Sequence, residues 1–185
     1  TASLTRRDCS VEGTDMSNRP ARVGVIGCGA ISATYLNNAA NFPSYDIVAV
    51  ADLRVDAAQA RADEFGVATA CTPDELLAND EIDIVINITP HSAHGAVGIA
   101  ALEAGKSVYV EKPLAVSLDD ARRMVALADD KGLRVGAAPD TFFGGTWQTA
   151  RALIDEGAIG DPIGGFSCIQ IRMAGPWREG DTEEE

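Results

Sequence analysis

The chain is poor in basic residues, and this shortage limits the class of partner that it can bind. Its 185 residues carry 15 basic and 28 acidic side chains, which gives a formal net charge of −13. Nucleic acids and anionic lipid surfaces are disfavoured as partners, because both attract basic rather than acidic proteins. An acidic surface that keeps the protein soluble is the ordinary interpretation of this charge.

Clustered cysteines and long apolar runs are also missing. No two cysteines form a C-x-x-C pair, so the sequence predicts neither a zinc site nor a dense disulfide framework, and a reducing, cytoplasmic compartment fits best. No segment approaches the roughly 20 apolar residues that span a bilayer. The pair Arg6-Arg7 could begin a twin-arginine export signal, but no apolar stretch follows it. We therefore expect no membrane span, no signal peptide and no metal site. The cysteines are Cys9, Cys28, Cys71 and Cys168.

A glycine-rich turn is the most informative feature that is present. Residues 23–32 read as an apolar strand that runs into a turn and then into a helix start. Gly27 permits the sharp turn, Gly29 lets the backbone approach phosphates, and Ser32 is small where the helix packs on the strand. Free N–H groups at the helix N-terminus would face a dinucleotide pyrophosphate. A single match of this kind arises easily by chance, so the rest of the chain must support it.

Cys28 lies between the two glycines of this turn. It is best interpreted as a small residue that the turn accepts. A redox role is the lesser alternative, because a helix N-terminus can lower the pKa of a thiol.

Strand and helix patterns alternate from residue 21 to about residue 143, which is typical of βαβ units around a parallel sheet. We expect an α/β fold with a doubly wound parallel sheet, as in Rossmann-like dinucleotide-binding domains. Glycines that suit a left-handed C-terminal cap close three of the helices. The predicted strands are 22–26, 46–51, 68–71, 82–88, 107–110 and 134–138, and the predicted helices are 30–40, 55–65, 72–79, 92–104 and 117–130.

Asp52 ends the second predicted strand, 20 residues after Ser32. A dinucleotide fold places at this spacing the carboxylate that receives the adenosine ribose hydroxyls. Arg54 follows closely, and an arginine there can cradle the 2′-phosphate of NADP. NAD is the favoured cofactor and NADP stays open. The alternative for Asp52 is a surface aspartate in a strand-to-helix loop.

The only two histidines of the chain, His91 and His94, follow the fourth predicted strand. Ligands of open α/β sheets bind at the carboxyl ends of the strands, so we place both histidines beside the cofactor rather than as catalytic bases. The structural alternative is that Thr89 or Ser92 caps the next helix while His94 satisfies local backbone groups.

Lys112 stands between Glu111 and Pro113 at the end of the next strand, at the mouth of the same crevice. A lysine held near a reacting hydroxyl can hydrogen-bond to it and help to move its proton. The alternative is an ordinary surface ion pair with Glu111. Pro113 favours the catalytic interpretation, because an X-Pro bond, cis or trans, fixes the direction of the lysine.

Together these segments resemble the glucose-fructose oxidoreductase/inositol dehydrogenase family, written Gfo/Idh/MocA. The resemblance covers about residues 20–175, and its most diagnostic part is the Glu-Lys-Pro element at 111–113, after Ala-Gly-Lys at 104–106. It is carried also by the glycine turn, Asp52, the loop 89–94 and residues 154–160. It implies an NAD(P)-dependent oxidoreductase that passes hydride between nicotinamide C4 and a sugar, polyol or related hydroxyl.

The resemblance also implies the roles of individual residues. Lys112 would be catalytic, reaching the substrate hydroxyl as well as the cofactor. The residues that would meet the cofactor are Gly27, Gly29, Ala30, Ile31, Asp52, Thr89, Pro90, His94, Glu111 and Lys112.

The last part of the chain departs from the family pattern. Family members continue into a large α/β substrate domain, where an Asp and a His complete the catalytic set; here no histidine follows His94, and the acids after Asp161 all lie in 179–185. We expect the start of that second α/β domain over 144–178, with a helix at 147–156 and one long strand at 163–173. The whole division is then a flexible extension over 1–19, a dinucleotide-binding domain over 20–143, this segment, and a disordered acidic tail over 179–185.

Two partners and three functions follow from this reading. A sugar- or polyol-like small molecule is expected if a second domain is supplied, and the unpaired edge of the strand at 163–173 could form a homo-oligomer. The chain is then a truncated or split oxidoreductase, a dinucleotide-binding module without catalysis, or an inactive remnant without a substrate domain.

Overall fold

The computed structural model describes residues 19–139 and 141–168, and strands alternate with helices along most of them. The strands are β1 Ala21–Ile26, β2 Tyr45–Ala51, β3 Thr69–Cys71, β4 Ile84–Asn87, β5 Ser107–Val110 and β6 Val135–Ala137. The helices are α1 Ser32–Ala39, α2 Val55–Phe65, α3 Pro73–Leu77, α4 His94–Glu103, α5 Leu118–Lys131 and α6 Gly145–Asp155, with short 3₁₀ turns η1 His91–Ala93 and η2 Thr141–Phe143.

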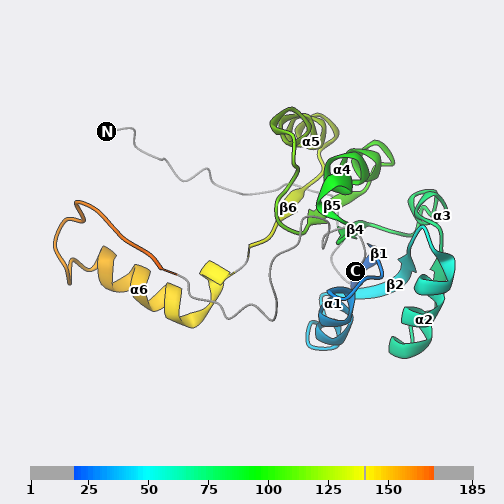
Figure 1. The fold of residues 1–185 in the computed structure, drawn as a ribbon, viewed down its shortest axis with the longest axis horizontal. Helices are drawn as coiled ribbons and strands as arrows, with labels where there is room; N and C mark the ends of the chain where they lie inside the picture. The colour runs from blue at the N-terminus through cyan, green and yellow to red at the C-terminus, as the bar shows by residue number, and fades with distance from the viewer. Residues whose placement is uncertain (1–18, 140, 169–185) are drawn as a thin grey trace, which may run out of the picture.

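The six strands form one parallel sheet in the order β3-β2-β1-β4-β5-β6. Helices α1 and α2 cover one face of the sheet and α4 and α5 cover the other (Figure 1). The chain moves outward from β1 to β3 and then returns to the centre at β4, which makes the sheet doubly wound. The predicted Rossmann-like α/β fold is therefore confirmed. Its switch point lies between β1 and β4, the place where open sheets of this kind bind ligands.

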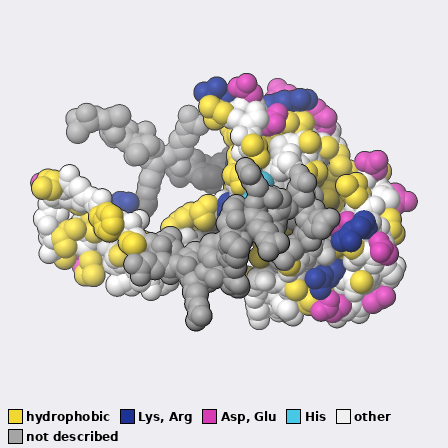
Figure 2. Space-filling model, in the orientation of Figure 1, with side chains coloured by type: hydrophobic (Ala, Val, Ile, Leu, Met, Phe, Trp, Pro, Cys, Tyr) yellow, Lys and Arg dark blue, Asp and Glu magenta, His cyan; other side chains and the backbone are white. Residues whose placement is uncertain are grey.

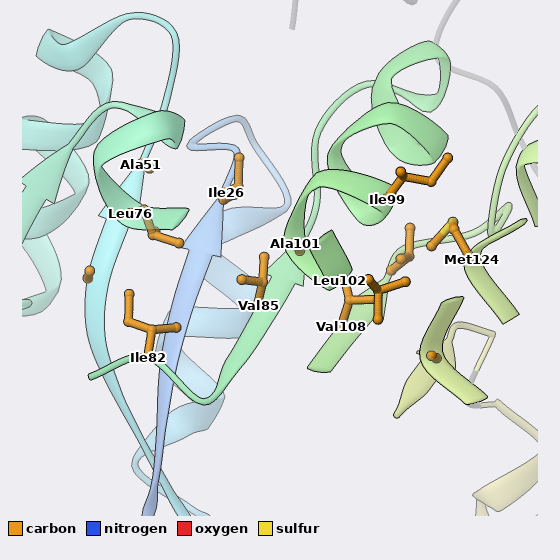
Figure 3. Packing of buried hydrophobic residues seen from close by; sticks show 13 residues of the cluster. Ile26, Ala51, Leu76, Ile82, Val85, Ile99, Ala101, Leu102, Val108 and Met124 are labelled. Atoms are coloured by element: carbon orange, nitrogen blue, oxygen red, sulfur yellow. The ribbon is translucent and has the colours of Figure 1, made fainter. Parts of the chain in front are cut away.

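The hydrophobic core consists of two clusters, one on each face of the sheet. Along β1, Val23 and Val25 belong to the cluster under α1 and α2, whereas Ile26 belongs to the opposite cluster. Figure 3 shows that opposite cluster, to which Val85 of β4 and Leu102 of α4 both contribute. Burial on both faces explains why the central strands are nearly continuous apolar runs rather than alternating ones.

The helix ends follow the capping signals in the sequence. Thr72 forms a capping box with Glu75: its hydroxyl accepts from the backbone N–H of Glu75 at 3.3 Å, and the Glu75 carboxylate accepts from the N–H of Thr72 at 2.9 Å. Ser117 caps α5 in the same position. Gly66 and Gly132 end α2 and α5 in the left-handed conformation, with φ of +70° and +67°.

The segment after β6 is far less buried than the rest. Helix α6 has no buried residue, and its Trp147 and Leu153 are exposed. Figure 2 shows hydrophobic side chains on the surface of this part of the molecule. The strand expected over 163–173 is wrong for residues 163–168, where the structure assigns no strand. The reason is physical: an extended segment becomes a strand only by pairing, and Ile163 and Phe166 are almost fully exposed. Residues 169–173 and the predicted tail at 179–185 lie outside the described residues, and the predicted domain boundaries stay a prediction.

Two general properties of the described residues bear on function. No helix among them combines the length and apolar character needed to cross a membrane. The same residues contain no group of three His, Cys, Asp or Glu side chains arranged to hold a metal ion.

Candidate cofactor site

The glycine turn after β1 can be built only with glycine at position 27. Gly27 has φ of +110°, and a Cβ at this position would lie 2.7 Å from the carbonyl oxygen of Ile88. Its N–H donates to the carbonyl of Ala51 at 2.8 Å. The turn therefore packs between the end of β2 and the residue that follows β4, at the switch point of the sheet. Residues 29–31 belong to this turn, so α1 begins at Ser32 rather than at residue 30 as predicted.

The side chains of Ser32 and Asp52 both hydrogen-bond to the backbone of the turn and thereby fix its shape. The buried Ser32 hydroxyl donates to the carbonyl of Gly29 at 2.6 Å. Asp52 Oδ2 accepts from the N–H of Cys28 at 2.8 Å, and its Oδ1 accepts from the N–H of Arg54 at 2.9 Å. An ionised carboxylate has about four acceptor positions, so Asp52 keeps capacity for ribose hydroxyls while it braces the turn.

Cys28 is buried in the turn, and its Sγ contacts the carbonyl oxygen of Ala51 at 3.6 Å. Burial, followed by the nearby negative charge of Asp52, raises the pKa of this thiol to about 11. The reactive species of a cysteine is the thiolate, which is scarce at neutral pH when the pKa is raised in this way. The interpretation of Cys28 as a small residue accepted by the turn is therefore favoured over a redox role.

Asn87 organises the loop that follows β4, and the sequence analysis missed it. Its buried amide donates to the carbonyl of His94 at 3.0 Å, and its Oδ1 accepts from the Thr89 hydroxyl at 2.7 Å. Its backbone carbonyl accepts from the N–H of Glu111 at 2.9 Å. Asn87 thereby joins the loop after β4 to the end of β5. The signal that could have found it is a single amide inside an otherwise apolar strand.

His94 is fully buried, with 0% of its surface exposed. Its Nδ1 lies 2.6 Å from the carbonyl oxygen of Pro113, and its Nε2 lies 2.8 Å from the carbonyl oxygen of Thr89. The ring of His91 meets it edge-on, with centroids 5.6 Å apart. Both polar atoms of His94 are thus occupied by the backbone of the two loops that flank Lys112.

Glu111 holds the start of the Glu-Lys-Pro element. Its Oε1 accepts from the hydroxyl of Tyr35 on α1 at 2.9 Å, and its Oε2 accepts from the backbone N–H of Lys112 at 2.7 Å. No local pattern marks Tyr35 as a partner of Glu111, because the two residues are 76 positions apart. The peptide bond between Lys112 and Pro113 is cis. Among the described residues, the Lys112 ammonium takes part in no ion pair, so the alternative interpretation, a surface ion pair with Glu111, is not what the structure shows.

A cavity of about 210 Å³ lies where these loops meet. It brings together five of the residues predicted to meet the cofactor, and Pro90 directly follows one of them, Thr89, in the chain. The glycine turn contributes Ile31 to this cavity, and Asp52 follows β2 at the same edge of the sheet. The lining residues are Ile31, Ile88, Thr89, His91, His94, Glu111 and Lys112.

Known proteins resemble this chain in sequence and in fold. The Gfo/Idh/MocA family, described as an oxidoreductase family with an NAD-binding Rossmann fold, matches residues 21–138. This chain belongs to that family. The resemblance seen in the sequence is therefore confirmed, and so is NAD(P) as the class of cofactor.

Two relatives show what share of a family member's length this chain covers. Inositol 2-dehydrogenase of Salmonella typhimurium is 32% identical over 146 residues, which are 77% of this chain and 44% of the relative. An uncharacterized oxidoreductase of Streptococcus pneumoniae is 36% identical over 143 residues, 77% of this chain and 38% of the relative. The chain spans less than half the length of these relatives.

A solved structure gives the same picture. KijD10, a 3-ketoreductase from Actinomadura kijaniata crystallised with TDP-benzene and NADP, superposes with a TM-score of 0.71 at 32% identity. The match covers 76% of this chain and 45% of that one. The matched part has the same fold in a protein whose structure contains the cofactor.

Proposed function

We propose that this chain binds NAD(P) along the carboxyl edge of its sheet and serves an oxidoreductase that acts on a hydroxyl of a sugar or polyol. The observation that carries the proposal is the position of Lys112. Its ammonium has no ion-pair partner among the described residues, and it lines the same cavity as Ile31 of the glycine turn. The Lys112 ammonium beside the glycine turn is therefore free to bind a substrate that lies next to the cofactor.

Each part of the cofactor has a place in this arrangement. The pyrophosphate would lie on the N–H groups of residues 29–31, next to the N-terminus of α1. The adenosine ribose would donate to Asp52, and the nicotinamide would enter the cavity beside Thr89 and Lys112. Ile31 and Ile88 supply apolar walls that exclude water from the ring.

The protein's own part in the chemistry falls to Lys112. Bound NAD(P) supplies or accepts the hydride at nicotinamide C4. In the reducing direction the Lys112 ammonium would donate a proton to the ketone oxygen as the hydride adds to the carbon. In the oxidising direction the neutral amine would accept the proton of the substrate hydroxyl as the hydride leaves. The Glu111 carboxylate accepts from the backbone N–H of Lys112, which holds the backbone that carries the lysine side chain. The names of the relatives, an inositol dehydrogenase and a 3-ketoreductase, support a sugar-like substrate.

We further propose that NAD is preferred to NADP. Asp52 braces the glycine turn through Cys28, so its carboxylate is fixed at the place where the ribose 2′ position would lie. A 2′-phosphate there would be repelled by this negative charge. Arg54 follows on the exposed side of the loop and offers the opposing attraction.

A second candidate, a dinucleotide-binding module without catalysis, is favoured by one observation. In the cavity, the Glu111 carboxylate has both oxygens engaged, by Tyr35 and by the backbone of Lys112. Of the lining residues, only Lys112 and His91 have polar side-chain atoms that make no hydrogen bond among the described residues.

Calorimetry followed by a rate assay separates these functions. The purified chain would be titrated with NAD⁺, NADH, NADP⁺ and NADPH, and formation of NADH would then be followed with myo-inositol and related polyols. We expect NAD⁺ and NADH to bind more tightly than the phosphorylated forms. Binding together with polyol-dependent NADH formation supports the oxidoreductase. Binding without any reaction supports the module, and failure of all four dinucleotides to bind contradicts both.

A further inference from the structure

The hydroxyl of Tyr35 joins two elements that are far apart in the chain. Tyr35 lies in the first turn of α1, three residues after Ser32, and it donates to Glu111 Oε1 at 2.9 Å. Glu111 directly follows β5, and β4 separates β5 from β1 in the sheet. The hydrogen bond therefore connects the helix after the glycine turn to the Glu-Lys-Pro element, across the switch point of the sheet.

The position of this hydroxyl is fixed by the packing of its ring. Tyr35 is partly buried and packs against the core cluster under α1 and α2. A tyrosine side chain has only two torsions, so a packed ring leaves its hydroxyl little freedom. Tyr35 is not among the residues that line the 210 Å³ cavity, whereas Glu111 is. The Tyr35 hydroxyl therefore acts on the cavity through Glu111.

The Glu111 carboxylate has a competing partner in the next residue of the chain. A glutamate beside a lysine ordinarily forms a weak surface ion pair with it. Here Oε1 accepts from Tyr35 and Oε2 accepts from the backbone N–H of Lys112 at 2.7 Å. Within the part of the chain that the structure describes, the Lys112 ammonium forms no ion pair. The carboxylate is thus held on the backbone of the lysine rather than on its ammonium.

We propose that Tyr35 is a positioning residue, whose hydroxyl holds the Glu111 carboxylate on the backbone and thereby keeps it from pairing with the Lys112 ammonium. The part of Lys112 in the reaction rests on the proposed function; the hold of Tyr35 on Glu111 does not. Without the hydroxyl, Oε1 loses its donor, and the carboxylate turns to the cation that follows it in the chain. Lys112 is then engaged by Glu111 instead of by the substrate oxygen.

The chain contains only three lysines, which makes the state of Lys112 directly measurable. The folded chain would be treated with limiting acetic anhydride, and acetylation of each lysine would be followed by mass spectrometry. Lys131 is exposed and serves as the internal reference. We expect Tyr35→Phe to lower the Lys112 rate relative to Lys131 about threefold, because an ion pair favours the ammonium over the reactive amine. An unchanged relative rate overturns the proposal.

Tyr45→Phe is the matched control. Tyr45 is also partly buried and packs against the same core cluster, and it begins β2 at the opposite edge of the sheet. Its ring stacks on that of Phe42, with centroids 6.0 Å apart. The variant should leave the relative acetylation rate of Lys112 unchanged. Equal falls in the two variants would mean that loss of any tyrosine hydroxyl loosens the cluster, and the proposal would be overturned.

The route through Glu111 is tested by a double-variant comparison. NADH affinity and polyol-dependent NADH formation would be measured for Tyr35→Phe, Glu111→Gln and the two combined. Tyr35→Phe should slow kcat about tenfold, the effect of one hydrogen bond to a charged group, and change NADH affinity by no more than about twofold. In the Glu111→Gln background no carboxylate competes, so Tyr35→Phe should cause no further slowing. Equal slowing in both backgrounds overturns the route through Glu111.

The two experiments separate this proposal from the proposed function. If the unaltered chain binds no NADH or forms none from polyols, the function of Lys112 fails, while the acetylation rates still decide the hold of Tyr35 on Glu111. If Tyr35→Phe does not fold, acetylation of Glu111→Gln decides instead. An unchanged Lys112 rate supports the proposal, since a held carboxylate leaves the lysine alone. A rise of about threefold would show that the two side chains already pair in the unaltered chain and overturns it.

Discussion

The two edges of the sheet use similar polar residues but bond them differently. At the amino edge, Lys106 donates to two backbone carbonyls, and Asp83 accepts from Arg19 at 2.9 Å and from the N–H of Arg22 at 2.8 Å. Those side chains are committed to the protein itself. At the carboxyl edge, Lys112 keeps an ammonium without an ion pair among the described residues, and it lines a cavity. The amino edge holds the fold together, and the carboxyl edge keeps capacity for a ligand.

The comparison predicts that changes at the carboxyl edge remove cofactor binding, whereas changes at the amino edge remove stability. Gly27→Val should have the largest effect and should do both. It places a branched side chain at φ of +110°, where even a Cβ alone would lie 2.7 Å from the carbonyl oxygen of Ile88. We expect a loss of at least about 3 kcal/mol in the free energy of unfolding and no detectable NADH binding, measured by urea unfolding and calorimetry.

Gly66→Ala is the control for this change. Gly66 also has a positive φ, of +70°, but a Cβ there would meet nothing within 4 Å. It should cost about 1 to 2 kcal/mol from the left-handed backbone alone and leave NADH affinity unchanged. Equal losses of NADH affinity in Gly27→Val and Gly66→Ala would show that the close approach of residue 27 to Ile88 is not what cofactor binding requires.

Lys112→Met should have the next largest effect, and it acts on rate rather than on folding. Loss of a group that moves the substrate proton should slow polyol-dependent NADH formation by about 10² to 10⁴ times, with unfolding unchanged. Lys131→Met is the control, since Lys131 at the end of α5 is exposed and donates to the carbonyl of Glu103 at the end of α4. A Lys112→Met variant as fast as the parent chain would exclude the proposed catalytic role.

Whether a feature of these two edges could be predicted from the sequence depends on how far apart in the chain its contacting residues are. The glycine turn, Asp52 and the Glu-Lys-Pro element were predicted from local spacing, and the structure places all three at the carboxyl ends of the strands. Tyr35 was not found, because its partner Glu111 lies 76 residues away and nothing local marks the pair. Residues 163–168 were wrongly predicted as strand for the same reason: apolar character was visible, but the absence of a pairing strand among the described residues was not.

Lys106→Met should act at the amino edge alone. The variant leaves the carbonyls of Asn79 and Ile82 without their buried donor, which should cost about 1 to 3 kcal/mol in urea unfolding. NADH affinity of the folded protein should stay the same. A loss of affinity larger than the loss of stability explains would mean that the two edges are coupled, and the comparison between them would fail.

Asp52→Asn should change the choice of cofactor more than its binding. The amide keeps an oxygen for the Cys28 N–H but removes the charge that repels a 2′-phosphate. We expect the affinity ratio of NADPH to NADH to rise about tenfold, corresponding to about 1.4 kcal/mol of relieved repulsion. Calorimetry with both reduced dinucleotides measures the ratio. An unchanged ratio would place the 2′ position of the ribose away from Asp52.

The smallest effect should come from the ionisation of Asp83 at the amino edge. Burial raises the pKa of this carboxyl, but hydrogen bonds from the Arg19 guanidinium and the Arg22 N–H, with the charges of both arginines, outweigh it and lower the pKa overall. A lowered pKa in the folded state means that the stabilisation is complete above the ordinary value of about 3.9 and is lost as the pH falls through the lowered value. Unfolding stability should therefore decline on acidification below about pH 4, and Asp83→Asn should reduce that decline. Because the group lies at the amino edge, NADH affinity at neutral pH should be the same in both proteins; a difference would show that ionisation at one edge reaches the other.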